Sequence, residues 1–394
     1  MGTTKLTARA LNRATLARQL LLARAELDVP TAIRRIVALQ AQHPASPYIA
    51  LWNRLSPFDP TTLDAALADH RLVRATLMRV TVHTVHADDY TPFREAMEPT
   101  LRGSRLGDPR YRACGLTAAD ADAFLPHLLT YAEARPRTAA ELRTWLEDHL
   151  GTAATATPAD TAAHRMLRHY APLWHAPTGG PWSFDTRQSY VAASPRPSLT
   201  DPEAAAEGLR TLIRRYLQGF GPATVADMAQ FALIQQRRIK TALSAMPEEL
   251  ETLHATDTGQ TLYDIPGAPR PPEDTPAPPR LLPMWDSTLL AYADRGRLLP
   301  PEYRPYVTRA NGDVLPTLLV DGKVAGIWRP LPDSIEATAF HPLPTPVWDA
   351  LTEEATALHT FLTTRSDPTP YRRHDHWWTK PLPPTAETRV LSAA

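Results

Sequence analysis

Three times along the chain, segments with the apolar spacing of helices are followed by a short β-type run. In the first set, helical spacing covers residues 11–24, 31–42, 46–55 and 60–70, and an alternating β-branched run lies within 72–86. The order recurs in residues 135–193 and again in 208–266. A winged-helix domain has this order, in which helices are followed by a small β-hairpin. The sequence therefore predicts a mainly α fold with β (α+β), built from tandem winged-helix domains.

A short motif marks the same place in each set. Residues 136–142 (PRTAAEL) and 222–228 (PATVADM) share a pattern, and 30–36 (PTAIRRI) is a looser copy. In each, a polar residue after a proline opens a helix, as a helix-turn-helix unit requires. The motif supports a repeated architecture.

The pattern of predicted secondary structure changes from helical to β-rich after a proline-rich, charged segment. Downstream, β-rich runs surround Asn311-Gly312 and Asp321-Gly322, which are strong hairpin turns, and residues 348–362 predict a closing helix. We therefore predict five parts. They are winged helix 1 (1–112), winged helix 2 (113–197), winged helix 3 (198–268), a proline-rich linker or loop (269–280) and a C-terminal β-rich module (281–394).

The charge of the chain is balanced overall but not along its length. There are 42 basic and 42 acidic residues, yet the residues up to Arg112 include 16 of the basic and 10 of the acidic ones. This bias is compatible with a nucleic-acid surface and equally with a solvated arginine-rich face. With a single cysteine, Cys114, and no run of 18 apolar residues, we expect a cytoplasmic protein without a membrane span.

Gln40 and Gln42 stand just before His43 and Pro44 in the segment VALQAQHPASP. In mid-helix, residues two apart point about 200° away from each other and cannot face one substrate. Pro44 disfavours the helical region for His43, so we expect the helix to end at or just before His43. At such an end both side chains can turn toward one cleft. The alternative is a pair of surface glutamines.

Other clusters of polar residues do not match the motifs of known catalytic or metal sites. No phosphate-binding loop, dinucleotide fingerprint, nucleophile elbow or zinc-protease motif is present. The triplet 374–376 (HDH) could hold a metal, but it lies in a proline-flanked tail. Asp88 and Asp89 point apart on a strand and are expected to cap a helix that begins near Thr91. We therefore expect neither a metal nor a cofactor.

Five segments, in order, resemble the family of winged-helix DNA glycosylases typified by AlkZ and YcaQ. They span nearly the whole chain: 39–55 (LQAQHPASPYIALWNRL), 75–90 (ATLMRVTVHTVHADDY), 214–229 (RRYLQGFGPATVADMA), 281–295 (LLPMWDSTLLAYADR) and 316–328 (PTLLVDGKVAGIW). Gln40-Ala41-Gln42 is similar to the Q-x-Q motif of the AlkZ-like branch, whereas the YcaQ-like branch has Q-x-D. Val80 stands where relatives often carry glycine.

The resemblance implies three winged helices around a C-shaped channel and a C-terminal β-rich module. It also implies hydrolysis of the N-glycosidic bond of N7-alkylated purines in double-stranded DNA, with Gln40 and Gln42 as the catalytic residues. The AlkZ-like branch is associated with self-resistance to DNA-alkylating natural products, including agents that form bulky adducts. Three winged helices in one chain favour a monomer. The rival interpretations are a winged-helix transcriptional regulator and a damage-sensing protein that binds DNA without cutting it.

A channel for duplex DNA needs basic side chains that contact phosphates. We expect this role for arginines in the first helices, in the first hairpin and in the DRGR segment, with His83 near the cleft. The candidates are Arg34, Arg35, Arg79, His83, Arg295 and Arg297. For any one of these arginines, a solvated surface position is the more common alternative. Trp52 could line the cleft, although a core position suits it better.

Overall fold

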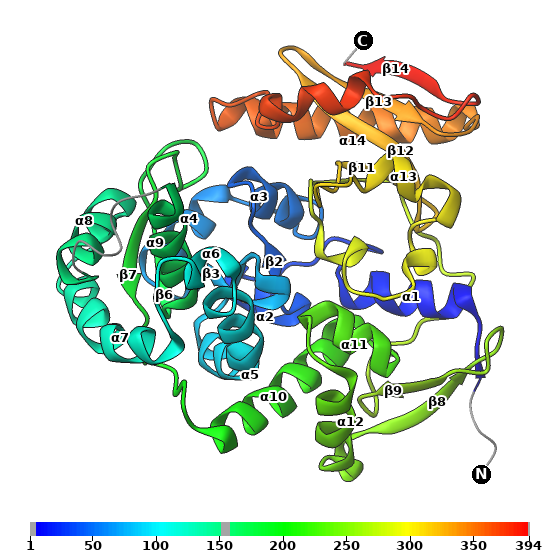
Figure 1. Cartoon of the computed structure of the whole chain (residues 1–394). Coiled ribbons are helices and arrows are strands. Elements are labelled where there is room, and N and C mark those ends of the chain that lie inside the picture. The colour runs from blue at the N-terminus through cyan, green and yellow to red at the C-terminus, as the bar shows by residue number, and fades with distance from the viewer. Residues whose placement is uncertain (1–4, 151–157, 393–394) are drawn as a thin grey trace.

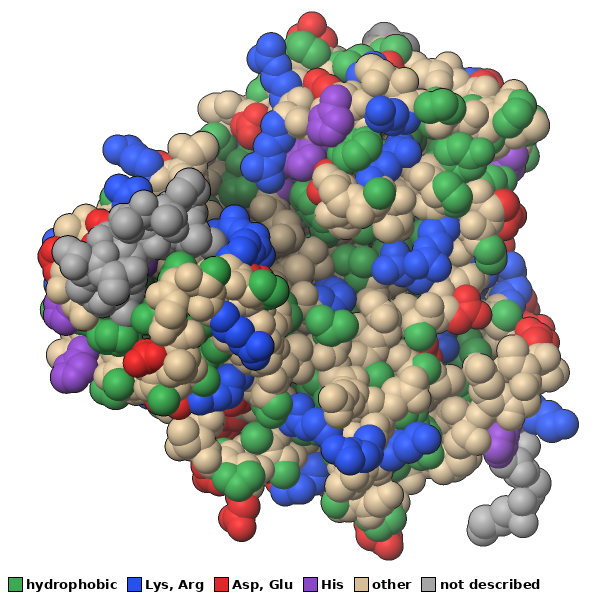
Figure 2. All heavy atoms as spheres, in the orientation of Figure 1, with side chains coloured by type: hydrophobic (Ala, Val, Ile, Leu, Met, Phe, Trp, Pro, Cys, Tyr) green, Lys and Arg blue, Asp and Glu red, His purple; other side chains and the backbone are tan. Residues whose placement is uncertain are grey.

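The computed structural model describes residues 5–150 and 158–392, and within them the strands form three sheets. Figure 1 shows helices arranged around a central region, with the five-stranded C-terminal sheet above them. The architecture is α+β, as the sequence predicts. Figure 2 shows that the face in view is hollowed between the α8–α9 lobe and the C-terminal module, with Lys and Arg side chains around the hollow.

The first unit has the element order of a winged helix. It consists of α2 (Val29–Ile36), β2 (Leu39–Gln40), α3 (Ala45–Trp52), α4 (Pro60–Ala68), β3 (Leu72–Thr76) and β4 (Val82–His86). Strand β4 lies between β2 and β3 and pairs antiparallel with both. Asp28 caps α2 by accepting a hydrogen bond from the backbone N–H of Thr31. The proline that follows Asp28 by two residues suits the first turn, where a backbone N–H has no partner to lose.

The second unit repeats that order and shares a sheet with the first. It consists of α7 (Ala118–Glu133), β5 (Arg137–Thr138), α8 (Ala139–Leu150), α9 (Pro158–Tyr170), β6 (Leu173–Ala176) and β7 (Ser189–Ala192). The six strands run β2-β4-β3-β6-β7-β5, and the two halves meet where Ala75 of β3 pairs with Trp174 of β6. The first two wings thus form one continuous sheet. Helices α5 (Ala87–Leu106) and α6 (Pro109–Arg112) connect the two units.

The third unit consists of α10 (Pro202–Phe220), α11 (Val225–Ala232), α12 (Gln236–Ser244), β8 (Glu251–Ala255) and β9 (Thr261–Asp264). Thr224 and Asp227 form a capping box at the start of α11. Thr138 and Glu141 exchange equivalent bonds at the start of α8. These two copies of the proline motif therefore open a helix with a polar cap, as the sequence predicts. In the looser copy at 30–36 the prediction is wrong, because α2 begins before the proline and its cap is Asp28.

The C-terminal module is an antiparallel sheet in the order β10 (Arg280–Leu282), β11 (Thr317–Val320), β12 (Lys323–Leu331), β13 (Ser334–Ala339) and β14 (Glu387–Leu391). The long helix α14 (Thr345–Thr364) packs against β10, β13 and β14. Asp321 and Gly322 form the predicted turn between β11 and β12, both with positive φ. The predicted closing helix is thus confirmed, with three more residues at its start and two more at its end.

The N-terminal segment joins the third unit to the proline-rich segment. Strand β1 (Lys5–Leu6) pairs in parallel with β8, and α1 (Ala8–Arg18) packs on α10. The proline-rich segment lies along α1, where Arg13 donates to the carbonyl oxygen of Thr275 at 2.7 Å and Arg18 to that of Pro269 at 3.1 Å. The division into five parts with the boundaries given above stays a prediction. In the parts of the chain described, no helix combines the length and apolar character needed to cross a membrane.

Candidate active site

Gln40 and Gln42 lie on a strand and its extension, not at the end of a helix. Helix α2 ends at Ile36, Val37 adopts a φ of 77°, and Gln40 pairs with His83 of β4. The predicted continuation of the helix to His43 is therefore wrong, because the chain leaves the helical conformation at Val37 and then pairs with β4. The backbone N–H of Ala41 donates to the carbonyl oxygen of Val82 at 2.8 Å, which continues the pairing. Since side chains two apart on a strand share a face, the two glutamines face the same side.

The carbonyl of Gln40 is anchored by an arginine of the first wing. Gln40 is 6% exposed, and its Oε1 accepts a hydrogen bond from Nη2 of Arg79 at 2.7 Å. Its backbone N–H donates to Oγ of Ser287 at 3.2 Å. A guanidinium can only donate, so this contact identifies Oε1 and leaves the amide N–H₂ directed elsewhere.

The carbonyl of Gln42 is anchored by the backbone of β4. Its Oε1 accepts from the N–H of Val82 at 3.0 Å, and the side chain is exposed. A backbone N–H is again only a donor. Both glutamines therefore keep an N–H₂ group and one carbonyl lone pair free of these anchoring contacts. The pair combines one buried amide and one solvent-accessible amide on the same edge.

Arg79 and His83 form a short chain of hydrogen bonds that ends at Gln40. Nη2 of Arg79 lies 3.1 Å from Nε2 of His83, and Nδ1 of His83 lies 3.1 Å from the carbonyl oxygen of Thr81. The tautomer that satisfies both contacts carries its proton on Nδ1. Burial, and then the charge of Arg79, hold the pKa of His83 well below its ordinary value, so the ring is neutral. The imidazole thus accepts from the same Nη2 that holds Gln40.

The backbone conformation of the first wing aims Arg79 at this site. Arg79 and Val80 have φ values of 52° and 58°, in the left-handed region that glycine adopts most readily. This explains the position where relatives often carry glycine. Nη1 of Arg79 donates to the carbonyl oxygen of Phe231 at 2.8 Å, at the end of α11. Burial, with the charge of Arg295, lowers the pKa of Arg79 to about 10, which leaves it protonated at neutral pH.

The C-terminal module supports the glutamine strand from behind. Ser287 accepts from the backbone of Gln40 and donates to the carbonyl oxygen of Ala38 at 2.9 Å. Next to it, Asp286 forms a two-point ion pair with Arg54, with both distances at 2.9 Å and both side chains fully buried. The sequence offered no signal for these contacts beyond the resemblance, because more than 200 residues separate the partners.

The remaining predicted DNA contacts are dispersed. Arg34 is 3.5 Å from Asp88, whereas Arg35 is exposed and has no ion pair with a described carboxylate. Arg295 donates to Oγ1 of Thr308 at 3.1 Å, and Arg297 donates to the carbonyl oxygen of Pro222 at 2.9 Å. A DNA-binding role for these arginines stays a prediction. The same holds for Arg79 and His83, which the structure engages in protein contacts.

Three other expectations concern polar or aromatic side chains. Helix α5 begins at Ala87, with His86 as its cap, so the expected start near Thr91 is wrong by one turn. Among the residues that the structure describes, no three His, Cys, Asp or Glu side chains are placed to hold a metal. His374 lies 3.4 Å from Asp313. Trp52 is partly buried and packs under Arg24 and beside Phe361, at the edge of the core.

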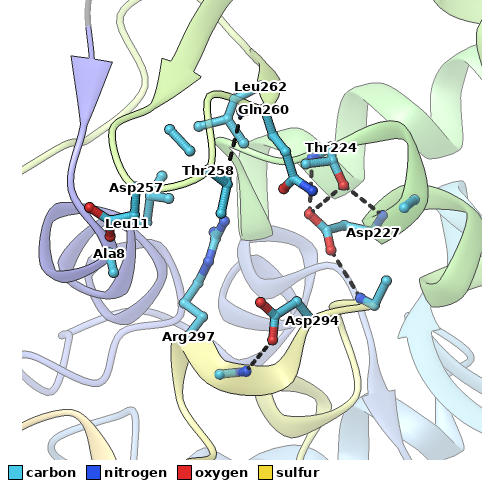
Figure 3. A pocket seen from close by; sticks show the side chains of 14 residues that line it. Ala8, Leu11, Thr224, Asp227, Asp257, Thr258, Gln260, Leu262, Asp294 and Arg297 are labelled. Atoms are coloured by element: carbon cyan, nitrogen blue, oxygen red, sulfur yellow. Dashed lines mark hydrogen bonds between the residues drawn. The ribbon is translucent and has the colours of Figure 1, made fainter.

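A separate pocket of about 310 Å³ lies between α1, α11, the β8–β9 hairpin and residues 293–297 (Figure 3). Two of its three acidic groups are engaged within the protein, and the third, Asp257, is exposed. Asp227 caps α11 and accepts from the backbone N–H of Ala293, and Asp294 accepts from that of Gly296. Neither catalytic candidate lines this pocket, and the glutamine pair remains the candidate site.

The chain combines tandem helix–hairpin units, a glutamine pair on a strand edge beside the first wing, and a hollow with basic side chains. This combination is that of the winged-helix DNA glycosylases. The sequence profile of the family described as "DNA glycosylase AlkZ-like" matches residues 33–361. The chain therefore belongs to the AlkZ-like DNA glycosylase family.

Two further comparisons support that assignment. The chain is 24% identical over 334 residues to the "Interstrand DNA cross-link repair glycosylase" of Streptomyces sahachiroi, covering 82% of this chain and 88% of that protein. Its fold is similar to the solved structure of "Streptomyces sahachiroi DNA glycosylase AlkZ", with a TM-score of 0.76 and 21% identity. That alignment covers 93% of this chain and 98% of the other.

Proposed function

We propose that this glycosylase hydrolyses the N-glycosidic bond of N7-alkylated purines in double-stranded DNA. The observation that carries the proposal is the pair of glutamines on one strand edge, each with its carbonyl anchored and its amide N–H₂ free of that contact. Alkylation at N7 gives the purine a positive charge, so the base leaves as a neutral molecule and needs no general acid.

The remaining task is to place a water molecule at the deoxyribose and to favour an oxocarbenium-like transition state. A free carbonyl lone pair accepts from that water and one N–H₂ group orients it, which leaves one lone pair of the water oxygen free to attack the deoxyribose C1′. No described carboxylate is hydrogen-bonded to Gln40 or Gln42. Because an amide is too weak a base to deprotonate water fully near neutral pH, the mechanism is restricted to cationic adducts.

Arg79 has a positioning role in this scheme. It forms no ion pair with a described carboxylate, and its Nη2 is shared between Gln40 and His83. Such a charge-assisted bond holds the side-chain amide of Gln40 in one rotamer. Gln40 is therefore presented to the sugar in one orientation, which is the preorganisation that catalysis requires.

Bulky adducts and interstrand crosslinks are the substrates we favour. The relative from Streptomyces sahachiroi carries cross-link repair in its name. Gln42 is exposed, and the hollow beside the C-terminal module is open in Figure 2, so an adduct need not enter a closed pocket. We propose a monomer that protects its host against a DNA-alkylating natural product. Survival of cells that express the chain, across a panel of alkylating metabolites, tests the self-resistance role.

Excision is the direct test of the activity. The protein is incubated with a duplex that contains one N7-methylguanine, and the product is heated in alkali to cut the strand at any abasic site. We expect strand scission at the lesion. Tight, sequence-specific binding without scission would favour a regulator, and lesion-specific binding without scission would favour a damage sensor.

A further inference from the structure

Leu233 is an apolar side chain that the fold holds out into solvent. It is 51% exposed, and among the described residues the only other large hydrophobic side chain with such exposure is Val390. Its backbone has φ 58° and ψ 47°, the left-handed conformation at the end of α11. That conformation is uncommon for leucine and usual for glycine, which often occupies helix-turn-helix turns. An exposed leucine in a strained turn indicates a role outside the core.

The turn that carries Leu233 is fixed from two sides. The carbonyl oxygen of Leu233 accepts from Oγ1 of Thr100, on α5, at 3.1 Å. Two residues earlier, the carbonyl oxygen of Phe231 accepts from Nη1 of Arg79, whose other terminal nitrogen holds Gln40. The side chain therefore extends from a rigid support that is connected to the glutamine site through one arginine.

The surroundings of Leu233 suit a nucleic acid. Leu233, Gln230, Gln235 and Gln236 line one groove of about 400 Å³. On α12, Arg237 and Lys240 are exposed and form no ion pair with a described carboxylate, and the helix contains no acidic residue. Amide side chains can bond to base edges, and unpaired cations attract phosphates. An apolar tip between them has the composition of a wedge that enters a DNA groove.

We propose that Leu233 inserts between base pairs next to the damaged nucleotide and opens the stack beside it. The inference rests on the proposed function, because the occupant is the duplex that carries the lesion. Partial unstacking kinks the duplex and exposes the deoxyribose to the glutamine edge. The third winged helix then supplies a DNA-distorting contact, in addition to the basic side chains of the channel.

The test uses two variants of Leu233 and one control. Leu233→Asn removes the apolar tip and suits the left-handed backbone, so the fold is retained or stabilised. Leu233→Ala removes the tip alone. Val390→Ala is the matched control, since Val390 is 60% exposed on β14. Each protein is mixed with a duplex that contains N7-methylguanine and, next to it, the fluorescent base 2-aminopurine.

We expect the wild-type protein and Val390→Ala to give a rise in 2-aminopurine fluorescence before excision. Both Leu233 variants should lose most of that rise and excise the base at least about fivefold more slowly in single turnover. An unchanged rise in Leu233→Asn would overturn the inference. The exposed leucine would then be assigned to contact with a protein partner instead of DNA. A rise that depends on Leu233 without any excision by the wild-type protein would support the wedge and contradict the proposed function.

Discussion

Nη2 of Arg79, in the first wing, lies 2.7 Å from Oε1 of Gln40, on the strand that the wing flanks. The same nitrogen lies 3.1 Å from the neutral ring of His83, and the other terminal nitrogen reaches the third unit at Phe231. One side chain thus connects the candidate catalytic strand, the wing and α11. We expect the orientation of Gln40 to depend on it.

Substitution of Arg79 should impair chemistry more than binding. Arg79→Lys keeps the charge but loses the planar fork that serves three acceptors. A charge-assisted bond contributes about 1.5–3 kcal/mol, which corresponds to a fall in kcat of roughly 10- to 100-fold. Single-turnover excision and duplex affinity are measured together, with Arg187→Lys, 88% exposed, as the control. An equal loss of affinity and rate in Arg79→Lys would identify a phosphate contact instead.

The buried ion pair between Arg54 and Asp286 should be essential for stability. Asp286→Asn leaves a fully buried guanidinium without its charge partner, which costs about 3–5 kcal/mol. The measurement is the free energy of unfolding in urea, compared with Glu207→Gln at an exposed pair. Because Ser287 follows Asp286 and contacts Gln40, excision should fall as well. Equal stability of the two variants would contradict this account.

Stability should decrease on mild acidification because the fold lowers the pKa of several histidines, among them the buried His43 and the half-buried His169. Burial, then neighbouring positive charges, lowers the pKa of His43 and of His169 from 6.5 to about 3. A group whose folded pKa lies below its unfolded value favours unfolding once the unfolded chain binds the proton. Stability is therefore complete above pH 6.5 and declines as pH falls from 6.5 toward 3.

Urea midpoints between pH 7 and pH 5 measure that decline. His43→Gln should reduce the slope of the midpoint against pH, because it removes one of the histidines whose pKa the fold lowers. His127→Gln, at an exposed position on α7, is the matched control and should keep the full slope. A midpoint that rises on acidification would show that the two rings are charged in the folded protein.

Arg295 should contribute to DNA affinity in a salt-dependent way. It is half-buried, its side chain donates a hydrogen bond to the Thr308 hydroxyl, and it forms no ion pair with a described carboxylate. If it contacts one phosphate, Arg295→Gln should reduce the slope of log affinity against log salt by about 0.9. Titration of a duplex at several salt concentrations gives the slope, and Arg187→Gln should leave it unchanged. An unaltered slope in Arg295→Gln would show that Arg295 does not contact a phosphate.

Local patterns predicted the repeated helices, their caps and the hairpin turns, because those features depend on neighbouring residues. The end of α2 could not be predicted in this way. Its apolar spacing continues past Ile36, and the chain leaves the helix because residues 39–40 pair with β4, a partner more than 40 residues away. The same pairing removed the geometric objection to Gln40 and Gln42, since alternation on a strand places them together.

The contacts that complete the site were beyond sequence reasoning. The sequence predicts a phosphate contact for Arg79, which stays a prediction, but it does not predict that a left-handed backbone directs the guanidinium toward Gln40 and Phe231. Ser287 and Asp286 lie more than 200 residues after the glutamine strand in the sequence. Only the tertiary fold brings them next to that strand. Their roles follow from packing between units, for which no local spacing is a signal.

The most direct test of the account is single-turnover excision of N7-methylguanine by Gln40→Ala and Gln42→Ala, beside the wild-type protein. Each variant is first shown to bind the duplex and to unfold at the wild-type midpoint. We predict that each single substitution lowers the excision rate by at least about tenfold, with duplex affinity unchanged. Excision at the wild-type rate by Gln42→Ala would contradict the proposal that the two amides together position the attacking water.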